Sequence, residues 1–251
     1  MKPAAFAWAP TSGLQQAVAA LLDTEARAMA GGQSLGPMLN LRATRPATVV
    51  PLAALQDLHG AEDTPDALTL GAATTHAAIA DGRTPDIYLG GRPVLAGIAG
   101  GIAYRAVRTR GTIGGSLCHA DPASDWLVTL TALRATVLTT RRAVSLDRFV
   151  TGPYRTVLDP GEIVRAVRIP RPTAGARWGY HKLCRKPGEF AHAMAACLVG
   201  PGTRIVIGAV DGPPIVLSGP DEADAALAFL DSVDRRLQVV AMRRAMAEAG
   251  A

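Results

Sequence analysis

Two glycine pairs that precede hydroxyl residues are the segments of this sequence best suited to bind a ligand. Adjacent glycines let backbone N–H groups approach an anion closely and adopt positive φ, and serine adds a hydroxyl donor. The segments consist of Ala30, Gly31, Gly32, Gln33, Ser34 and Leu35, and of Thr112, Ile113, Gly114, Gly115 and Ser116. Together they predict two anion-binding loops that hold the two phosphates of one dinucleotide, whereas either segment alone also fits an ordinary turn after a strand.

Two acidic residues follow the second segment. Asp121 precedes Pro122, which predicts a helix with Asp121 at its N-cap and the proline in its first turn. Asp125 then falls in the first turn, where it either stabilises the helix dipole or accepts hydrogen bonds from ribose hydroxyls. His119 and Cys118 do not form a metal site, because no further ligands occur at useful spacing.

A third candidate segment spans residues 180–191 and is a basic strand followed by a turn and a run of small residues. Lys182 could donate a hydrogen bond to a flat ring, and Phe190 could pack against it. A solvated edge strand with a core aromatic is the alternative interpretation of the same residues.

Other nucleotide and nucleophile motifs do not explain the chain. The sequence contains no G-x-G-x-x-G and no Gly-Lys-Ser/Thr, which argues against a Rossmann fingerprint or a P-loop. Residues 32–36 do match G-x-S-x-G, the nucleophile elbow of α/β-hydrolases. Ser34 follows at most two predicted strands, however, and Pro37 occupies the helix that should supply amide donors, so we reject the hydrolase interpretation.

Composition narrows the class of protein. The chain has 251 residues, of which 49% are apolar and 19% charged, so it is neither disordered nor fibrous and should form one or two domains. Residues 100–190 contain 15 Lys and Arg against 6 Asp and Glu, a net charge of +9 that favours an anionic ligand. No nucleic-acid motif accompanies this charge. Three cysteines without C-x-x-C spacing, no 18-residue apolar run and no signal-peptide pattern predict free thiols in a cytoplasmic protein without a membrane span.

Short elements must position these segments. Alternation and turn residues predict strands in the ranges 6–8, 26–30, 48–55, 68–71, 136–140, 162–169 and 204–210. Apolar spacing predicts helices after Thr11 or Ser12, over residues 91–104, after Asp121 and at the C-terminus. Helices and strands mix without a regular βαβ rhythm, so we expect an α+β fold. The proline pair at residues 170 and 172 predicts a domain boundary.

In combination, the segments resemble the FAD-binding medium subunits of molybdenum-containing hydroxylases, the family of carbon monoxide and xanthine dehydrogenases. The matching stretches lie in the expected order and cover nearly the whole chain; they are residues 30–42, 110–125, 160–164 and 182–190. The resemblance implies a two-subdomain FAD-binding fold of the vanillyl-alcohol oxidase type. Residues 1–170 would form the FAD-binding domain, with subdomains of about 1–55 and 56–170. Residues 171–251 would form a small C-terminal α+β domain, shorter than is usual in the family.

The resemblance also implies roles. Residues 31–34 and 112–116 would hold the FAD pyrophosphate, and Asp125 the adenosine ribose end. Asp121 would bind the cofactor as part of the second flavin loop, and Val164, Lys182 and Phe190 would lie near the isoalloxazine. Ser116 stands where many relatives have Asn, and Phe190 where others have Tyr. The chain would carry electrons within a heterotrimer, from a small [2Fe-2S] subunit that serves a large molybdopterin subunit to an external acceptor. No catalytic or metal-ligating residue is expected. A stand-alone flavoprotein oxidoreductase and a flavin-free scaffold subunit are the alternatives.

Overall fold

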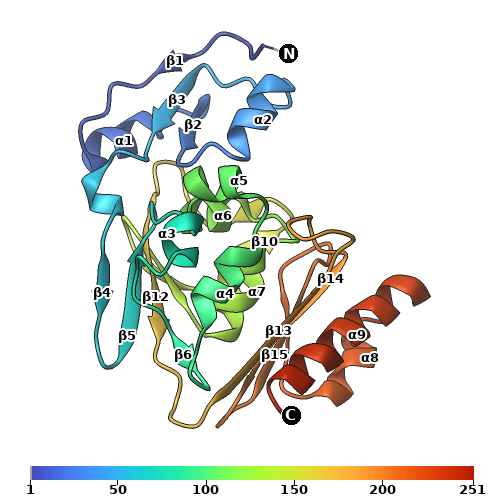
Figure 1. Cartoon of the computed structure of the whole chain (residues 1–251). Coiled ribbons are helices and arrows are strands. Elements are labelled where there is room, and N and C mark those ends of the chain that lie inside the picture. Colours follow the sequence, from blue (N-terminus) through green and yellow to red (C-terminus); the bar gives the residue numbers. More distant parts are fainter. Residues whose placement is uncertain (1) are drawn as a thin grey trace.

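The computed structural model describes residues 2–251, which form three sheets of three or more strands in succession along the chain (Figure 1). The first sheet is parallel, with strand order β1-β3-β2. Two short helices accompany it. The elements are β1 (Ala7–Trp8), α1 (Leu14–Ala20), β2 (Ala26–Met29), α2 (Leu35–Asn40) and β3 (Thr48–Pro51).

The second sheet is antiparallel, with order β4-β5-β12-β8-β9. Its strands are β4 (Ala61–Asp63), β5 (Ala67–Gly71), β8 (Thr136–Thr139), β9 (Ala143–Ser145) and β12 (Val164–Pro170). Helices gather on one side of this sheet (Figure 1). They are α3 (His76–Ala80), α4 (Val94–Gly101), α5 (Arg105–Arg110), α6 (Ile113–His119) and α7 (Asp125–Ala132). Short elements complete this part: η1 (Gln56–Leu58), η2 (Leu146–Arg148) and the hairpins β6 (Tyr88–Leu89), β7 (Arg92–Pro93), β10 (Val150–Gly152) and β11 (Arg155–Thr156).

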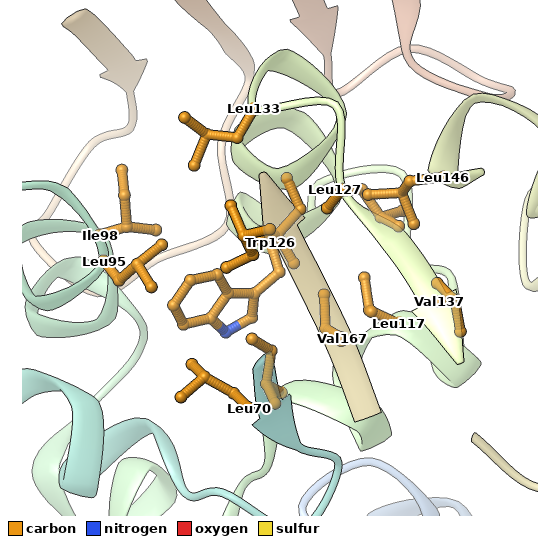
Figure 2. Close-up of a cluster of buried hydrophobic side chains, with 14 of the residues drawn as sticks. Leu70, Leu95, Ile98, Leu117, Trp126, Leu127, Leu133, Val137, Leu146 and Val167 are labelled. Carbon is orange, nitrogen blue, oxygen red and sulfur yellow. The ribbon is translucent and has the colours of Figure 1, made fainter. Parts of the chain in front are cut away.

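The largest buried side chain of this central part is Trp126 on α7, which is fully buried among aliphatic residues of the helices and the sheet (Figure 2). Its indole Nε1 donates to Nδ1 of His76 over 3.1 Å. Burial and the Arg108 guanidinium lower the pKa of His76 to about 4. The imidazole is therefore neutral near pH 7, and its Nδ1 can accept the indole hydrogen bond.

The third sheet, β13-β14-β15-β16, is antiparallel and lies between helix α7 and the C-terminal helix α9. Its elements are β13 (Arg177–Leu183), β14 (Ala193–Val199), β15 (Arg204–Gly208), β16 (Ile215–Leu217), η3 (Pro220–Glu222), α8 (Ala223–Ala226) and α9 (Ser232–Glu248). A Cβ on Gly179 would lie 1.8 Å from the carbonyl oxygen of Ala245 on α9, and one on Gly208 would lie 2.1 Å from Val128 on α7. Two glycines thus allow a helix to approach each face of this sheet.

The expected α+β class is confirmed by this mixture of a parallel sheet, antiparallel sheets and packed helices. Several local predictions were wrong. Helix α1 begins after Gly13, because Ser12 bonds the Gln16 side chain instead of capping the helix. Helix α7 begins after Ser124, and Asp121 instead accepts from the backbone N–H of Ala123 in the preceding turn. None of the described helices is long and apolar enough to cross a membrane.

Candidate functional site

A cavity of about 350 Å³ lies between the first sheet and the helical layer, a volume typical of small-molecule sites. Its lining includes the β2–α2 loop, the start of α6 and the start of β12. Most of the predicted site residues belong to this lining, namely Ala30, Gly31, Gly32, Gln33, Ser34, Leu35, Thr112, Gly114, Gly115, Ser116 and Val164. The structure therefore brings the two glycine segments together across 80 residues of sequence.

The β2–α2 loop supplies free hydrogen-bond donors. Among residues 2–251, no acceptor takes the backbone N–H of Gly31, Gly32, Gln33 or Ser34. Gly32 has φ +70°, which bends the chain into the left-handed region that glycine adopts without strain. Successive free amides around such a bend form a concave anion site. This loop has the donor set expected of a diphosphate-binding loop.

The second glycine segment differs from the prediction, because it is the first turn of α6 and not an open loop. Its amides are already bonded: Ile113 N–H donates to Thr74, Gly114 N–H to Ala72, and Gly115 N–H to the Thr112 hydroxyl. The Ile113 side chain is fully buried in the core and does not line the cavity. This segment therefore contributes a wall of small residues and the Ser116 hydroxyl, which lies 2.9 Å from the Ser124 hydroxyl.

The two segments are in direct contact. A Cβ on Gly31 would lie 1.9 Å from the carbonyl oxygen of Arg110, and a Cβ on Gly115 would lie 3.6 Å from Cβ of Ala30. Nε of Arg110 is 3.5 Å from the carbonyl oxygen of Gly31. Arg110 and the cavity-lining Arg27 add positive charge beside the free amides. Such charge favours an anionic ligand.

Besides Ile113, four predicted site residues lie outside the cavity lining. Asp121 occupies the turn between α6 and α7, where its carboxylate also accepts from the Tyr154 hydroxyl over 3.4 Å. Phe190 is 71% exposed on the loop after β13. A Cβ on Gly188 would lie 2.7 Å from the carbonyl oxygen of Ala103, so this loop packs against the segment that follows α4.

Asp125 and Lys182, the other two, form a buried ion pair. Nζ of Lys182 lies 2.9 Å from Oδ1 of Asp125 and 3.4 Å from the carbonyl oxygen of Gly101. The hydroxyl of Tyr180 donates to the same Oδ1 over 2.6 Å. Burial and the adjacent carboxylate raise the pKa of Tyr180 well above its ordinary value, which keeps the phenol protonated as a donor. Asp125 thus binds β13, the strand that leads into the Phe190 loop.

The sequence interpretation missed three polar residues that line the cavity: Arg27, His119 and Glu162. Glu162 lies in the 160–164 stretch, but its partners are distant in sequence and leave no local signal. Its carboxylate accepts from Nη2 of Arg142 over 3.0 Å and from the Thr139 hydroxyl over 2.7 Å. Burial opposes ionisation of Glu162, yet these hydrogen bonds outweigh it and lower the pKa to about 2.

The Glu162 network should make the fold sensitive to acid. The carboxyl pKa is 4.5 in an unfolded chain and about 2 in the folded one, so its contribution is present above pH 4.5 and is lost as pH falls towards 2. At about 1.4 kcal/mol per pKa unit, the contribution is roughly 3–4 kcal/mol. Chemical denaturation from pH 6 to pH 2 should show this loss in the wild type and a flatter profile in Glu162→Gln. Glu62→Gln, at an exposed site on β4, is the control; an equal flattening there would contradict the assignment.

Metal chemistry has no candidate residues in the described part of the chain. No group of three or more His, Cys, Asp or Glu side chains in residues 2–251 is arranged to hold a metal ion. The three cysteines, Cys118, Cys184 and Cys197, are all free thiols.

Comparison with known sequences defines the class. The profile of the FAD-binding domain in molybdopterin dehydrogenases matches residues 4–172. The chain therefore belongs to this family of FAD-binding domains, which are parts of oxidoreductases.

Individual relatives agree with this assignment. The chain is similar to the caffeine dehydrogenase subunit beta of a Pseudomonas strain, with 31% identity over 81% of this chain and 70% of the relative. It is 34% identical to the carbon monoxide dehydrogenase medium chain of Afipia carboxidovorans, over 79% of this chain and 70% of that one. A solved structure of carbon monoxide dehydrogenase from Hydrogenophaga pseudoflava superposes with a TM-score of 0.88 and 28% identity, covering 100% of this chain and 99% of the other.

Proposed function

We propose that this chain holds FAD in a molybdenum hydroxylase complex and passes electrons from the [2Fe-2S] clusters of a small partner subunit to an external acceptor. A large molybdopterin subunit would oxidise the substrate and supply those electrons. The names of the relatives as medium chains or as subunits support assembly with other chains. The free thiols support a cytoplasmic complex.

The single observation that carries the proposal is the run of four free amides at Gly31, Gly32, Gln33 and Ser34 inside the cavity. A run of amides that no protein acceptor takes suits a ligand with several acceptor oxygens. A diphosphate has those oxygens, and the glycine wall across the cavity leaves room for it. FAD thus fits the residues present, with its pyrophosphate on the β2–α2 loop and against the start of α6.

The domain division that fits this role follows the sheets. Residues 1–170 would be the FAD-binding domain, in which subdomains of about 1–55 and 56–170 carry opposite walls of the cavity. Residues 171–251, with the third sheet, would be the C-terminal domain. With it we propose the two-subdomain fold of the vanillyl-alcohol oxidase type for residues 1–170.

Bound FAD would supply a group that accepts and releases electrons, and the residues of this chain would orient it and set the local charge. We assign Ser116 and the free amides to the pyrophosphate, and Val164 to a face of the nucleotide. The carboxylate of Asp125 already accepts hydrogen bonds from Lys182 and Tyr180. We therefore assign Asp125 to the isoalloxazine end of FAD, where it would position Lys182, and no longer to the ribose. Phe190, exposed next to the Lys182 strand, would cover the ring.

Replacing Lys182 should change the reduction potential of the flavin. Lys182→Gln removes a positive charge and leaves the Asp125 carboxylate uncompensated, so both effects disfavour the addition of electrons. We expect a lower potential in Lys182→Gln and a higher one in Asp125→Asn, both measured by redox titration of the FAD-loaded chain. Lys186→Gln, an exposed change four residues further on, is the control. An unchanged potential in Lys182→Gln would contradict the assignment.

Co-expression separates this role from the alternatives. A relay subunit should bind FAD, co-purify with a small cysteine-rich subunit and a large subunit, and be reduced only when both are present with the substrate of the large one. A chain that turns over substrate alone would be a stand-alone flavoprotein oxidoreductase. A chain that stays colourless after addition of FAD would be a scaffold subunit, a reading that the free amides disfavour.

A further inference from the structure

One titratable side chain in the cavity wall has no role in the function proposed above. His119 is the last residue of α6, one helical turn beyond Ser116, and both residues line the cavity. Its side chain is 28% exposed, and its Nε2 lies 3.9 Å from Oδ2 of Asp121. The imidazole also stacks at a tilt on Tyr154, with ring centroids 5.2 Å apart.

Several charged or titratable groups surround this imidazole. Asp121 faces it from the α6–α7 turn and Tyr154 from the β10–β11 turn. The same cavity is lined by Arg27 from β2, by the neighbouring thiol Cys118 and by Glu162 from the segment before β12. Glu162 is paired with Arg142, so it stays ionised above pH 4.5.

His119 is uncharged at neutral pH in the protein by itself. Burial lowers the pKa of His119 below its ordinary value of 6.5, and the Asp121 carboxylate opposes this only in part. A dianion bound in the cavity that His119 lines would act in the opposite direction, because a nearby negative charge favours the protonated imidazole. The side chain is therefore neutral without a ligand and able to take up a proton with one.

We propose that His119 is a proton-linked binding residue for the nucleotide: entry of the diphosphate transfers one proton from solvent to the imidazole, which then faces the dianion as a cation. The proposal rests on the proposed function, since it takes FAD as the ligand. The step balances as neutral imidazole plus one solvent proton giving imidazolium, with no electron transferred. Binding would then weaken as pH rises through the pKa of His119 in the complex.

Isothermal titration calorimetry of the flavin-free full chain with FAD tests this. Titrations at pH 7 in buffers with different ionisation enthalpies give the number of protons taken up from the slope of the observed enthalpy. We expect net proton uptake and a Kd that rises about fivefold from pH 6.5 to pH 8.5 in the wild type. His119→Gln should show no uptake and a Kd that changes less than about twofold over that range.

His59→Gln is the matched control, because His59 lines a separate groove on the second sheet and should leave the uptake unchanged. Zero uptake in the wild type, or full uptake in His119→Gln, would overturn the proton linkage while leaving FAD binding intact. Failure of the wild type to bind FAD at any pH would instead overturn the proposed function. Binding of FAD by His119→Gln at pH 8.5 with near wild-type affinity shows that the variant is folded and supports the linkage.

Discussion

Replacing Gly31 by alanine is expected to lower the affinity for FAD at least about 100-fold, which corresponds to about 3 kcal/mol. The new Cβ would lie 1.9 Å from the carbonyl oxygen of Arg110 and 2.8 Å from Cα of Gly111, both backbone atoms. The β2–α2 loop must therefore move away from the start of α6. This movement displaces the free amides of residues 31–34 relative to the start of α6, which forms the opposite wall of the cavity. Flavin content after dialysis and the Kd of FAD measure the effect.

Gly36→Ala is the matched control for this prediction. Gly36 lies five residues further on, within α2, and a Cβ there meets no atom within 4 Å. Alanine favours the helix by up to about 1 kcal/mol over glycine, so this variant should keep its FAD and be no less stable. Equal FAD loss in both variants would show that the loop tolerates no change at all. The loss in Gly31→Ala could then not be attributed to the close contact with Arg110. Retention of FAD by Gly31→Ala would contradict the prediction directly.

Removal of the Asp125 carboxylate should destabilise the fold by about 3–5 kcal/mol, because it leaves the buried ammonium group of Lys182 without its partner. The side chains of Asp125 and Lys182 are 9% and 12% exposed, so water cannot replace the lost contact. Asp125→Ala also removes the acceptor of the Tyr180 hydroxyl. Urea denaturation followed by circular dichroism measures the free energy of unfolding.

A double-mutant cycle isolates the ion pair from other effects of Asp125→Ala. Lys182→Met alone leaves a buried carboxylate that still accepts from Tyr180, so its cost should be smaller than that of Asp125→Ala. The double variant should be more stable than the sum of the single costs indicates, by about 1–3 kcal/mol. Strict additivity of the two changes would show that the pair contributes no coupling.

The two glycine segments that line the cavity could be recognised from sequence because glycine and serine carry local information. Gly31 and Gly32 follow an apolar run that forms β2, and the positive φ of Gly32 is what a glycine pair permits. The pairing of the two glycine segments in one cavity also agrees with the idea of a shared diphosphate. What local patterns cannot show is whether the amides of a loop are free.

The second segment illustrates that limit. Glycines are poor helix formers, so residues 112–116 predict a loop. Tertiary contacts override this preference, because Ala72 and Thr74 accept the amides of Gly114 and Ile113 and fix the first turn of α6. A Cβ on Gly114 would lie 2.5 Å from Cβ of Ala72, so glycine is needed there for close packing and not for an open loop.

The long-range ion pairs also could not be predicted from the sequence. Asp125 and Lys182 are 57 residues apart in sequence, and Glu162 is 20 residues from Arg142. Asp125 fits a helix N-terminus well, which is why the helix dipole or a ribose hydroxyl was the natural expectation for it. Only the approach of β13 to α7 shows that its partner is a lysine of the third sheet.

Helix α7 has no solvent-facing side: all eight of its residues are buried, with Trp126 in the central core and Val128 against the third sheet. The sheets on either side of it cannot slide past each other without exposing these side chains to water. Electron tunnelling slows steeply with each added ångström between donor and acceptor. In the proposed relay role, such a helix would hold a redox group at a constant separation from its electron donor and acceptor, and so keep the transfer rate steady.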